Sequence, residues 1–394
     1  MAADLHLPHQ LPAAYKTLTA QCHCKSAHFT VTVPTSALPL PVHLCHCSIC
    51  RTTHGTFCCF HAPLPKGIEP EFVAPSSIES SLTTYIHSPQ APSERFFCST
   101  CGCHIGDRDL KPDPETGKPE WRVATSIFAA HDEDTFQIRA HCFTSRDTEP
   151  NLSTWLPSIG SRAIHVWKPS PDDPRFPFAT YQPPKPDVGE DALLAECRCG
   201  GVRFALPRPS PADAADPILS RFVRASPTPS SPGDGSGSDD DDDPRSRATG
   251  PPALKRVARV CVCRDCRLVS GTHAVAWTSA PRPPAVPPAL EGFGTLRCYR
   301  SSARARRAFC RVCGATVFYA RDNGDGGDQA VVDVAVGILR DADGRPALER
   351  WLVWRTGRLS GMESGRAFDA PFADALAEGL REWGVQRYGE GAEF

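Results

Sequence analysis

Clustered cysteines are the residues of this chain whose type and spacing could do chemistry, and they recur in one order in both halves. The sequence contains 19 cysteines. The first half carries Cys22 and Cys24, then Cys45, Cys47 and Cys50, then Cys98 and Cys101. The second half carries Cys197 and Cys199, then Cys261, Cys263 and Cys266, then Cys310 and Cys313. The series CxC, CxCxxC and CxxC therefore occurs twice, which indicates a duplicated domain.

A CxC motif and a distant CxxC motif together supply four thiolates, the number that closes a tetrahedral structural zinc site. Rubredoxin-like iron is the chemical alternative. One such site is assigned to Cys22, Cys24, Cys98 and Cys101, and the other to Cys197, Cys199, Cys310 and Cys313.

Each CxCxxC triplet has three thiolates and leaves one metal position open, the property that separates catalytic from structural zinc. The candidate catalytic residues are Cys45, Cys47, Cys50, Cys261, Cys263 and Cys266. The chain is therefore expected to bind about two Zn²⁺ ions per lobe. A second structural site is the alternative, with His46, His54 or His273 as the fourth ligand.

An iron–sulfur cluster would need a fourth cysteine at each triplet. The remaining cysteines, Cys58, Cys59, Cys103, Cys142 and Cys298, do not recur at matching positions and are interpreted as small buried residues. Four arginines, Arg300, Arg304, Arg306 and Arg307, could pair with a carboxylate of a small acidic ligand near the metal.

The elements that must position these thiols are short and β-like. Alternating or β-branched runs at residues 28–33, 202–206 and 331–339 predict strands. Residues 373–383 form the one clear amphipathic helix pattern. We predict a mainly β fold of two tandem zinc-binding lobes of antiparallel sheet, residues 14–182 and 190–372, followed by a helical tail, 373–394.

The gap between CxC and CxCxxC differs between the halves. It runs from Lys25 to Leu44 in the first and from Gly200 to Val260 in the second, where the excess is rich in Pro, Ser and Asp. This excess, residues 207–252, is predicted to be a disordered insertion in the second lobe.

Charge and hydropathy exclude several classes of partner. Lys plus Arg number 43 against 45 Asp plus Glu, so there is no overall basic field for nucleic acid. No apolar run reaches the roughly 18 residues of a membrane span, and residues 1–10 lack the pattern of a secretory signal. We expect a cytoplasmic or nuclear protein, whose reducing surroundings favour thiols as metal ligands over disulfides. The oligomeric state is left open.

The ordered series CxC, CHCxxCR with Gly-Thr downstream, and FCxxCG resembles the glutathione-dependent formaldehyde-activating enzyme family, which includes centromere protein V. The resemblance covers residues 15–160 and 193–360. It implies the β-tent fold, the four-thiolate sites as structural zinc and the triplets as catalytic zinc. It also implies formation of S-(hydroxymethyl)glutathione. The sequence departs from the family at Lys25, where the second repeat has Gly200, and at Val262, where the first has His46.

Three thiolates already overcompensate the charge of Zn²⁺, so the triplet metal should favour a soft sulfur ligand over water. We therefore expect a carbon–sulfur lyase acting on adducts of a small thiol such as glutathione with a small aldehyde. The alternative, from a different class, is a non-catalytic zinc scaffold that binds a protein partner.

Overall fold

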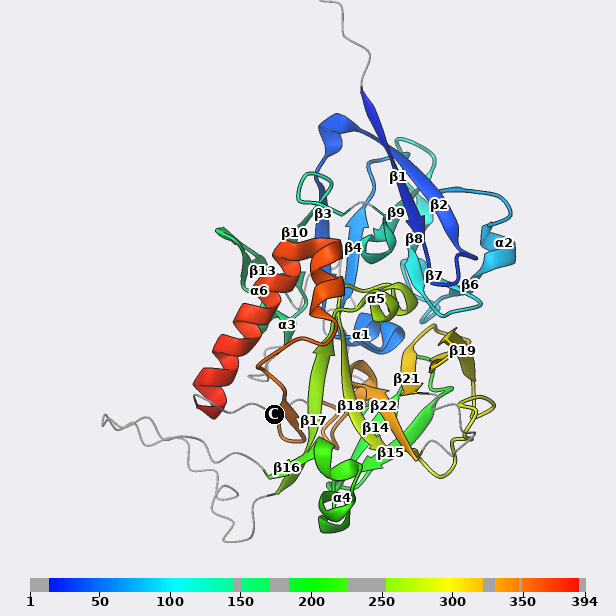
Figure 1. Cartoon of the computed structure of the whole chain (residues 1–394). Helices are drawn as coiled ribbons and strands as arrows, with labels where there is room; N and C mark the ends of the chain where they lie inside the picture. The colour runs from blue at the N-terminus through cyan, green and yellow to red at the C-terminus, as the bar shows by residue number, and fades with distance from the viewer. Residues whose placement is uncertain are drawn as a thin grey trace, which may run out of the picture.

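The computed structural model describes residues 14–129, 131–144, 151–170, 184–225, 253–321, 330–346 and 349–389. Figure 1 shows two β-rich lobes, the first coloured blue to cyan and the second green to orange, with a long helix beside them. The predicted mainly β class is confirmed. The exact boundaries of the two repeats stay a prediction.

The described part of the first lobe contains thirteen strands and several short helices. Its strands are β1 (Tyr15–Gln21), β2 (His28–Pro34), β3 (Leu40–Cys45), β4 (Cys59–Pro63), β5 (Glu71–Phe72), β6 (Leu82–Tyr85), β7 (Ser93–Cys98), β8 (His104–Pro112), β9 (Pro119–Ala124), β10 (Phe136–Cys142), β11 (Ser158–Ile159), β12 (Arg162–Ala163) and β13 (His165–Trp167). Its helices are η1 (Thr35–Ala37), α1 (Ser48–His54), α2 (Ile78–Ser81), η2 (Thr125–Ile127) and α3 (Leu152–Trp155).

The second lobe and the tail contain the remaining elements. The strands are β14 (Ala192–Glu196), β15 (Arg203–Pro207), β16 (Val223–Ala225), β17 (Leu254–Cys261), β18 (Val275–Pro281), β19 (Leu296–Ser302), β20 (Ala305–Cys310), β21 (Thr316–Arg321), β22 (Val331–Ala335), β23 (Leu339–Arg340) and β24 (Leu352–Trp354). The helices are α4 (Pro211–Ala215), η3 (Leu219–Phe222), α5 (Arg264–Ser270), η5 (Val336–Ile338) and α6 (Met362–Tyr388).

Strand order repeats between the lobes. The large sheet of the first lobe runs β13-β10-β3-β4-β9-β8-β7-β6, and that of the second runs β16-β17-β18-β22-β21-β20-β19 with β24 beside β17. Neighbouring strands pair antiparallel, except that β10 lies parallel to β3 and β13, and β24 lies parallel to β17. Each lobe also has a three-stranded sheet, β1-β2-β5 and β15-β14-β23. Six strands of the first sheet thus correspond, in spatial order, to six strands of the second: β3-β4-β9-β8-β7-β6 matches β17-β18-β22-β21-β20-β19.

Alternation along the strands explains why these segments build a core. In β2, Phe29, Val31 and Val33 are fully buried, while the intervening residues are only partly covered. Such alternation places one face of a strand against the core and the other toward solvent. Aromatic side chains also contribute to the core, including the fully buried Trp121, Trp155, Trp277 and Trp354.

The two lobes meet through the residues that flank the triplets. Arg51 crosses the junction and donates hydrogen bonds to the carbonyl oxygens of Gly337 (2.6 Å) and Leu339 (3.2 Å). Arg267, its counterpart in the second lobe, donates to the carbonyl oxygen of Ser126 in the first. The repeated arginine after CxCxxC therefore joins the lobes.

A glycine, Gly55 or Gly271, follows the repeated arginine by four residues in each lobe, and its backbone conformation explains why. Each ends its helix with φ of +73°, the left-handed region that favours glycine. A Cβ at Gly55 would lie 2.1 Å from the carbonyl oxygen of Thr316, and a Cβ at Gly271 would lie 2.3 Å from that of His104. Only glycine allows the helices of each lobe to approach a strand of the other so closely.

The predicted disordered insertion is wrong for its first part. Residues 211–225 form α4, η3 and β16, and β16 pairs antiparallel with β17. The helix forms because the Ser210 side chain caps it and the Asp213 carboxylate accepts a hydrogen bond from the Ser210 N–H. Residues 226–252 lie outside the described part of the chain.

The tail helix α6 begins at Met362, well before the predicted start at residue 373. It is interrupted at Asp369, whose φ of −151° is not helical, just before Pro371. The helix contacts α5 of the second lobe and α3 and β11 of the first. Figure 1 shows it running along the side of the molecule. No helix among the described residues is long and apolar enough to cross a membrane.

Candidate metal centres

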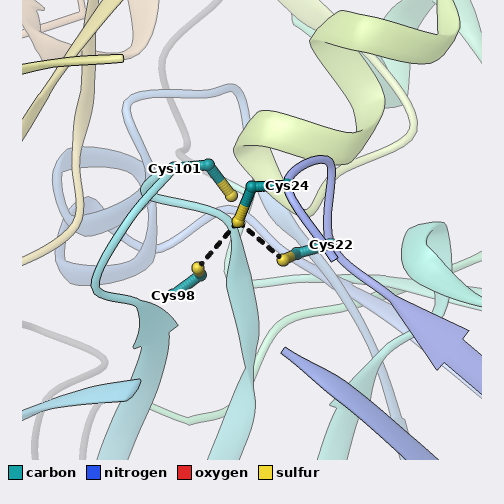
Figure 2. Close-up of side chains that lie close together, drawn as sticks. All are labelled: Cys22, Cys24, Cys98 and Cys101. Atoms are coloured by element: carbon teal, nitrogen blue, oxygen red, sulfur yellow. Dashed lines mark hydrogen bonds between the residues drawn. The ribbon is translucent and has the colours of Figure 1, made fainter. Parts of the chain in front are cut away.

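The first four-thiolate site forms where the β1–β2 turn meets the β7–β8 turn. Figure 2 shows the sulfur atoms of Cys22, Cys24, Cys98 and Cys101 converging on one point. The Cys24 sulfur lies 3.4 Å from that of Cys22 and 3.5 Å from that of Cys98. Tetrahedral zinc with bonds of about 2.3 Å separates its sulfur ligands by roughly 3.8 Å. The four thiols therefore fit a closed zinc site.

The second four-thiolate site has the same construction. Cys199 Sγ lies 3.6 Å from Cys197 Sγ and 3.4 Å from Cys310 Sγ, and Cys313 belongs to the same group. All four sulfur atoms lie within 4.8 Å of one another, as in the first site. The long excursion between CxC and CxCxxC in this lobe therefore does not prevent the site from forming.

One departure from the family pattern has a simple backbone explanation. Lys25 adopts φ of +65°, and Gly200 at the same turn position adopts φ of +74°. Each N–H bonds to the first cysteine carbonyl of its turn, at 3.1 Å from Cys22 and 3.0 Å from Cys197. The first lobe thus builds the same metal-binding turn with a lysine in the left-handed conformation, at some conformational cost.

Each triplet sits at the end of a strand and the start of a short helix. Cys47 precedes α1, and its sulfur accepts a hydrogen bond from the Cys50 N–H at 3.4 Å. Cys263 precedes α5 and accepts one from the Cys266 N–H at the same distance. These N–H groups stabilise sulfur in its thiolate form. The described structure brings together both predicted groups, Cys45, Cys47 and Cys50, and Cys261, Cys263 and Cys266.

The closed site of each lobe is hydrogen-bonded to the triplet helix of the other. The backbone N–H of His23, between Cys22 and Cys24, bonds to the Leu268 carbonyl in α5 at 3.2 Å. The N–H of Arg198, between Cys197 and Cys199, bonds to the Thr52 carbonyl in α1 at 3.1 Å. The four centres therefore form one connected unit across the lobe junction.

None of the histidines considered as a fourth ligand joins a triplet group. His46 Nε2 lies 2.9 Å from His141 Nδ1, and His54 Nδ1 lies 2.9 Å from the Cys50 carbonyl oxygen. Both imidazoles are held neutral, since burial lowers the pKa of His54 to about 3 and that of His46 well below its ordinary value. His273 lies in a different cluster, with His131 and Asp369.

A buried arginine faces each triplet. Sequence reasoning missed Arg95 and considered Arg307 only as a partner for a ligand carboxylate near the metal. Arg95 lies 3.7 Å from Cys50 Sγ, and Arg307 lies 3.4 Å from Cys266 Sγ. Burial by itself would lower the pKa of Arg95, but the Cys50 thiolate and Asp107 outweigh it and raise the pKa. The side chain stays charged. The sequence does contain a signal for this arginine, because in both halves Arg-x-Phe directly precedes the first cysteine of the CxxC motif.

Two cysteines interpreted as small buried residues lie at the first triplet. Cys59 pairs with Cys45 across β3 and β4 and packs in one cluster with the triplet cysteines. Cys142 pairs with Cys45 across β3 and β10. Cys59 lies outside the group formed by the three triplet thiols, whose sulfur atoms all lie within 4.8 Å of one another. Strand register, which the sequence does not reveal, brings these residues to the site.

The first triplet opens into a cavity of about 680 Å³, a volume typical of small-molecule sites. Its lining includes the three triplet thiols, Cys59, Cys142, Arg95, His87, His43, His61, Asp107, Arg122, Phe143 and Trp167.

A hydrogen-bonded polar chain forms one wall of this cavity. His61 Nδ1 lies 2.8 Å from Asp107 Oδ2, and Arg122 bonds to Asp107 and to Asp109. Burial would raise the pKa of Asp107, but Arg122 and His61 lower it, so the carboxylate is ionised and accepts the His61 Nδ1–H. The Nε2 atom of His61 has no hydrogen-bond partner among the described residues.

The second triplet has different surroundings. In the first lobe, Asp107 lies opposite Arg95 and His61 lies opposite Ala124 on neighbouring strands. At the matching positions of the second lobe, Tyr319 lies opposite Arg307 and Trp277 lies opposite Ala335. The Arg307 guanidinium lies over the Tyr319 ring, 4.9 Å from its centre. Trp277 packs with Cys261 and Cys266 in one apolar cluster. Aromatic rings therefore replace the polar wall.

Comparison with known proteins agrees with these centres. The family model described as "Glutathione-dependent formaldehyde-activating enzyme" matches residues 17–146 and 246–353. The second match begins after Cys197 and Cys199, which the fold nevertheless brings to Cys310 and Cys313. None of the curated proteins matches the chain. Because the model matches more than half of the residues, in two separate stretches, the chain belongs to the glutathione-dependent formaldehyde-activating enzyme family and carries the family domain twice.

Proposed function

We propose that the first lobe is a zinc-dependent carbon–sulfur lyase. It joins a small thiol such as glutathione to a small aldehyde such as formaldehyde and also catalyses the reverse reaction. The observation that carries this proposal is a single cavity of about 680 Å³ in which a three-thiolate group, a buried arginine and a histidine–aspartate pair meet. Family membership supports glutathione and formaldehyde as the substrate classes.

Zinc would be held by Cys45, Cys47 and Cys50, and when bound it would supply an open position that lowers the pKa of an incoming thiol. The protein must then stabilise the negative charge gathered around this position. Arg95 is placed to do so, since its guanidinium lies against Cys50 Sγ and is hydrogen-bonded to His87 Nδ1 at 3.0 Å. A buried cation beside several sulfur anions lowers their electrostatic energy more than it would in water.

His61 is the group that we propose moves the proton. Asp107 holds the proton of the imidazole at Nδ1, which leaves Nε2 as a lone pair. In adduct formation His61 takes the thiol proton, the sulfur forms its bond to the aldehyde carbon, and the carbonyl electron pair moves to oxygen. His61 then returns the proton to that oxygen, which gives the hydroxymethyl thioether. The reverse sequence releases the aldehyde.

The second lobe is proposed to have a mainly structural role. Trp277 and Tyr319 stand where the first lobe has His61 and Asp107, so this lobe lacks the histidine–aspartate pair at the matching positions. Its triplet still offers three thiolates within reach of one cation. We therefore propose that it binds zinc and supports the first lobe through the contacts of α5.

The proposal is tested by following ¹³C-formaldehyde and glutathione by NMR exchange with the zinc-loaded protein. Exchange between free aldehyde and its glutathione adduct should be accelerated well above the uncatalysed rate. Cys47→Ser should abolish the acceleration, whereas the matched Cys263→Ser should retain it. An exchange rate equal to the uncatalysed one with both triplets loaded would favour a zinc scaffold instead.

A further inference from the structure

Three side chains outside the thiol centres form a buried cluster at the junction of the lobes. His131 belongs to the first lobe, His273 to the second and Asp369 to the break in α6. Asp369 Oδ2 lies 3.1 Å from His131 Nδ1 and 3.8 Å from His273 Nδ1. The side chains of all three are less than a tenth exposed, at 2%, 1% and 8% for His131, His273 and Asp369.

The break in α6 directs the carboxylate into this cluster. Asp369 leaves the helical conformation, and its Oδ1 accepts a hydrogen bond from the Phe372 N–H at 3.0 Å. That bond caps the following helical segment and fixes the side chain. The other oxygen, Oδ2, is the one that faces both imidazoles.

The hydrogen bonds of Thr125 favour one tautomer of His273. The Thr125 hydroxyl donates to the Phe60 carbonyl oxygen at 3.4 Å, which leaves its oxygen to accept from His273 Nε2–H at 3.0 Å. His273 Nδ1 is then a lone pair that points toward a carboxylate oxygen. The His273 side chain is 1% exposed, and its Nδ1 has no hydrogen-bond partner among the described residues. Two electron-rich atoms facing each other in a buried site require a cation between them.

A simple ion pair accounts for only part of this arrangement. A protonated His131 could pair with Asp369, but His273 Nδ1 would remain without a partner. Moreover, neither nitrogen of His131 makes an aligned hydrogen bond within the described structure, despite the 3.1 Å contact. The His273 ring is stacked on Phe60 at 4.5 Å and the His131 ring on Phe136 at 5.3 Å. The rings are thus held in place by packing, as metal-ligating imidazoles commonly are.

We propose that His131, His273 and Asp369 form an additional metal site, which binds one Zn²⁺ ion and ties the two lobes to the C-terminal helix. Two imidazole nitrogens and one carboxylate oxygen are a ligand set typical of zinc, with bonds of about 2.0–2.2 Å. Tetrahedral ligands at that distance are separated by roughly 3.4 Å, between the two measured contacts. The Thr125 bond to the far nitrogen of His273 is the outer contact that such ligands usually make. This site is independent of the proposed lyase activity.

The full-length protein, purified after growth with zinc, provides the test. We expect Asp369→Asn to lower the zinc content by one equivalent per chain relative to the unmodified protein. The asparagine keeps an oxygen for the Phe372 N–H, so the helix cap is retained. Asp374→Asn, which removes an exposed carboxylate of the same helix, is the matched control and should not change the zinc content. Equal zinc content in all three proteins would overturn the proposal.

Cobalt substitution separates this site from the thiol centres. The sulfur-to-cobalt absorption arises from thiolate ligands alone, so it should be equal in the unmodified protein and in Asp369→Asn while total cobalt differs by one. If the absorption and the total cobalt of the variant fall together, the variant has lost thiol centres, and its lower metal content does not support the proposed site. A zinc-edge anomalous map of the unmodified protein then decides the matter: a peak between the three side chains is expected, and its absence contradicts the proposal.

Discussion

Arg95 and Arg307 lie at equivalent positions of the two lobes, and each guanidinium contacts the sulfur of the last cysteine of its own triplet, Cys50 and Cys266. Both arginines are buried and remain charged, since the facing thiolate raises the pKa of each against the effect of burial. The pair supports the proposal that both triplets are anionic groups that bind metal. Only Arg95 also faces the cavity.

Arg95→Gln should weaken glutathione binding to the zinc-loaded protein by roughly tenfold to a hundredfold, the effect of losing a charge-assisted contact worth about 1.5–3 kcal/mol. The physical reason is that Gln cannot offset the negative charge that an additional thiolate brings. Isothermal titration calorimetry measures the change. Arg307→Gln is the matched variant and should leave this affinity within about twofold; equal losses in both variants would show that the second lobe binds the thiol as well.

Closed and open thiolate sites should respond differently to loss of a ligand, because a closed zinc site contributes folding free energy directly. Cys98→Ser should unfold the first lobe. It should also loosen α5 of the second lobe, since the turn that carries His23 bonds to Leu268. Cys47→Ser should leave circular dichroism near that of the unmodified protein. Equal destabilisation by both changes would mean that the triplets are structural sites.

Cys59 should not be a required ligand, although it packs against the triplet cysteines. Val275 occupies the matching position in β18, opposite Cys261, and the second triplet forms without a fourth cysteine there. Cys59→Val should therefore keep the zinc content and leave thiol binding unchanged. Loss of one zinc ion per chain, measured by elemental analysis, would identify Cys59 as the fourth ligand of the first triplet.

Buried neutral histidines should make the folded state sensitive to mild acid. Burial lowers the pKa of His104 well below its ordinary value, and its Nε2 lies 3.1 Å from the Thr53 carbonyl oxygen. Below about pH 6.5 the unfolded chain takes up a proton that the folded chain does not, so stability falls as the pH falls, by up to about 1.4 kcal/mol per unit.

His104→Gln cannot titrate and should remove this contribution. Urea unfolding between pH 8 and pH 5.5 should therefore show a shallower loss of stability in the variant. Zinc release in acid affects both proteins and cancels in the comparison. Identical slopes would mean that His104 is protonated in the folded protein.

The candidate metal centres were predictable from sequence because local motifs supply the thiols that form them. CxC and CxxC are turns whose backbone directs two sulfurs to one point, so the grouping of Cys22 and Cys24 with Cys98 and Cys101 follows from spacing and ligand number. The duplication of the fold likewise follows from the repeated motifs.

The cavity was not predictable in the same way. His61, Asp107 and Arg122 come from three neighbouring strands and meet only through the register of β4, β8 and β9. No local motif marks them, and the second lobe does not repeat them. The ordered segment at residues 211–225 was missed for a related reason: its Pro- and Ser-rich composition indicates a loop, but Ser210 and Pro211 in fact start a capped helix.

The central claim is that the first triplet holds a metal with a position free for an external thiol. Replacing zinc by cobalt makes this visible, because a fourth sulfur ligand increases the sulfur-to-cobalt absorption. Adding glutathione to the cobalt protein should change that absorption, and Cys47→Ser should erase the change while Cys263→Ser retains it. An unaltered spectrum with both triplets loaded would show that the protein itself fills the fourth position, which contradicts the account.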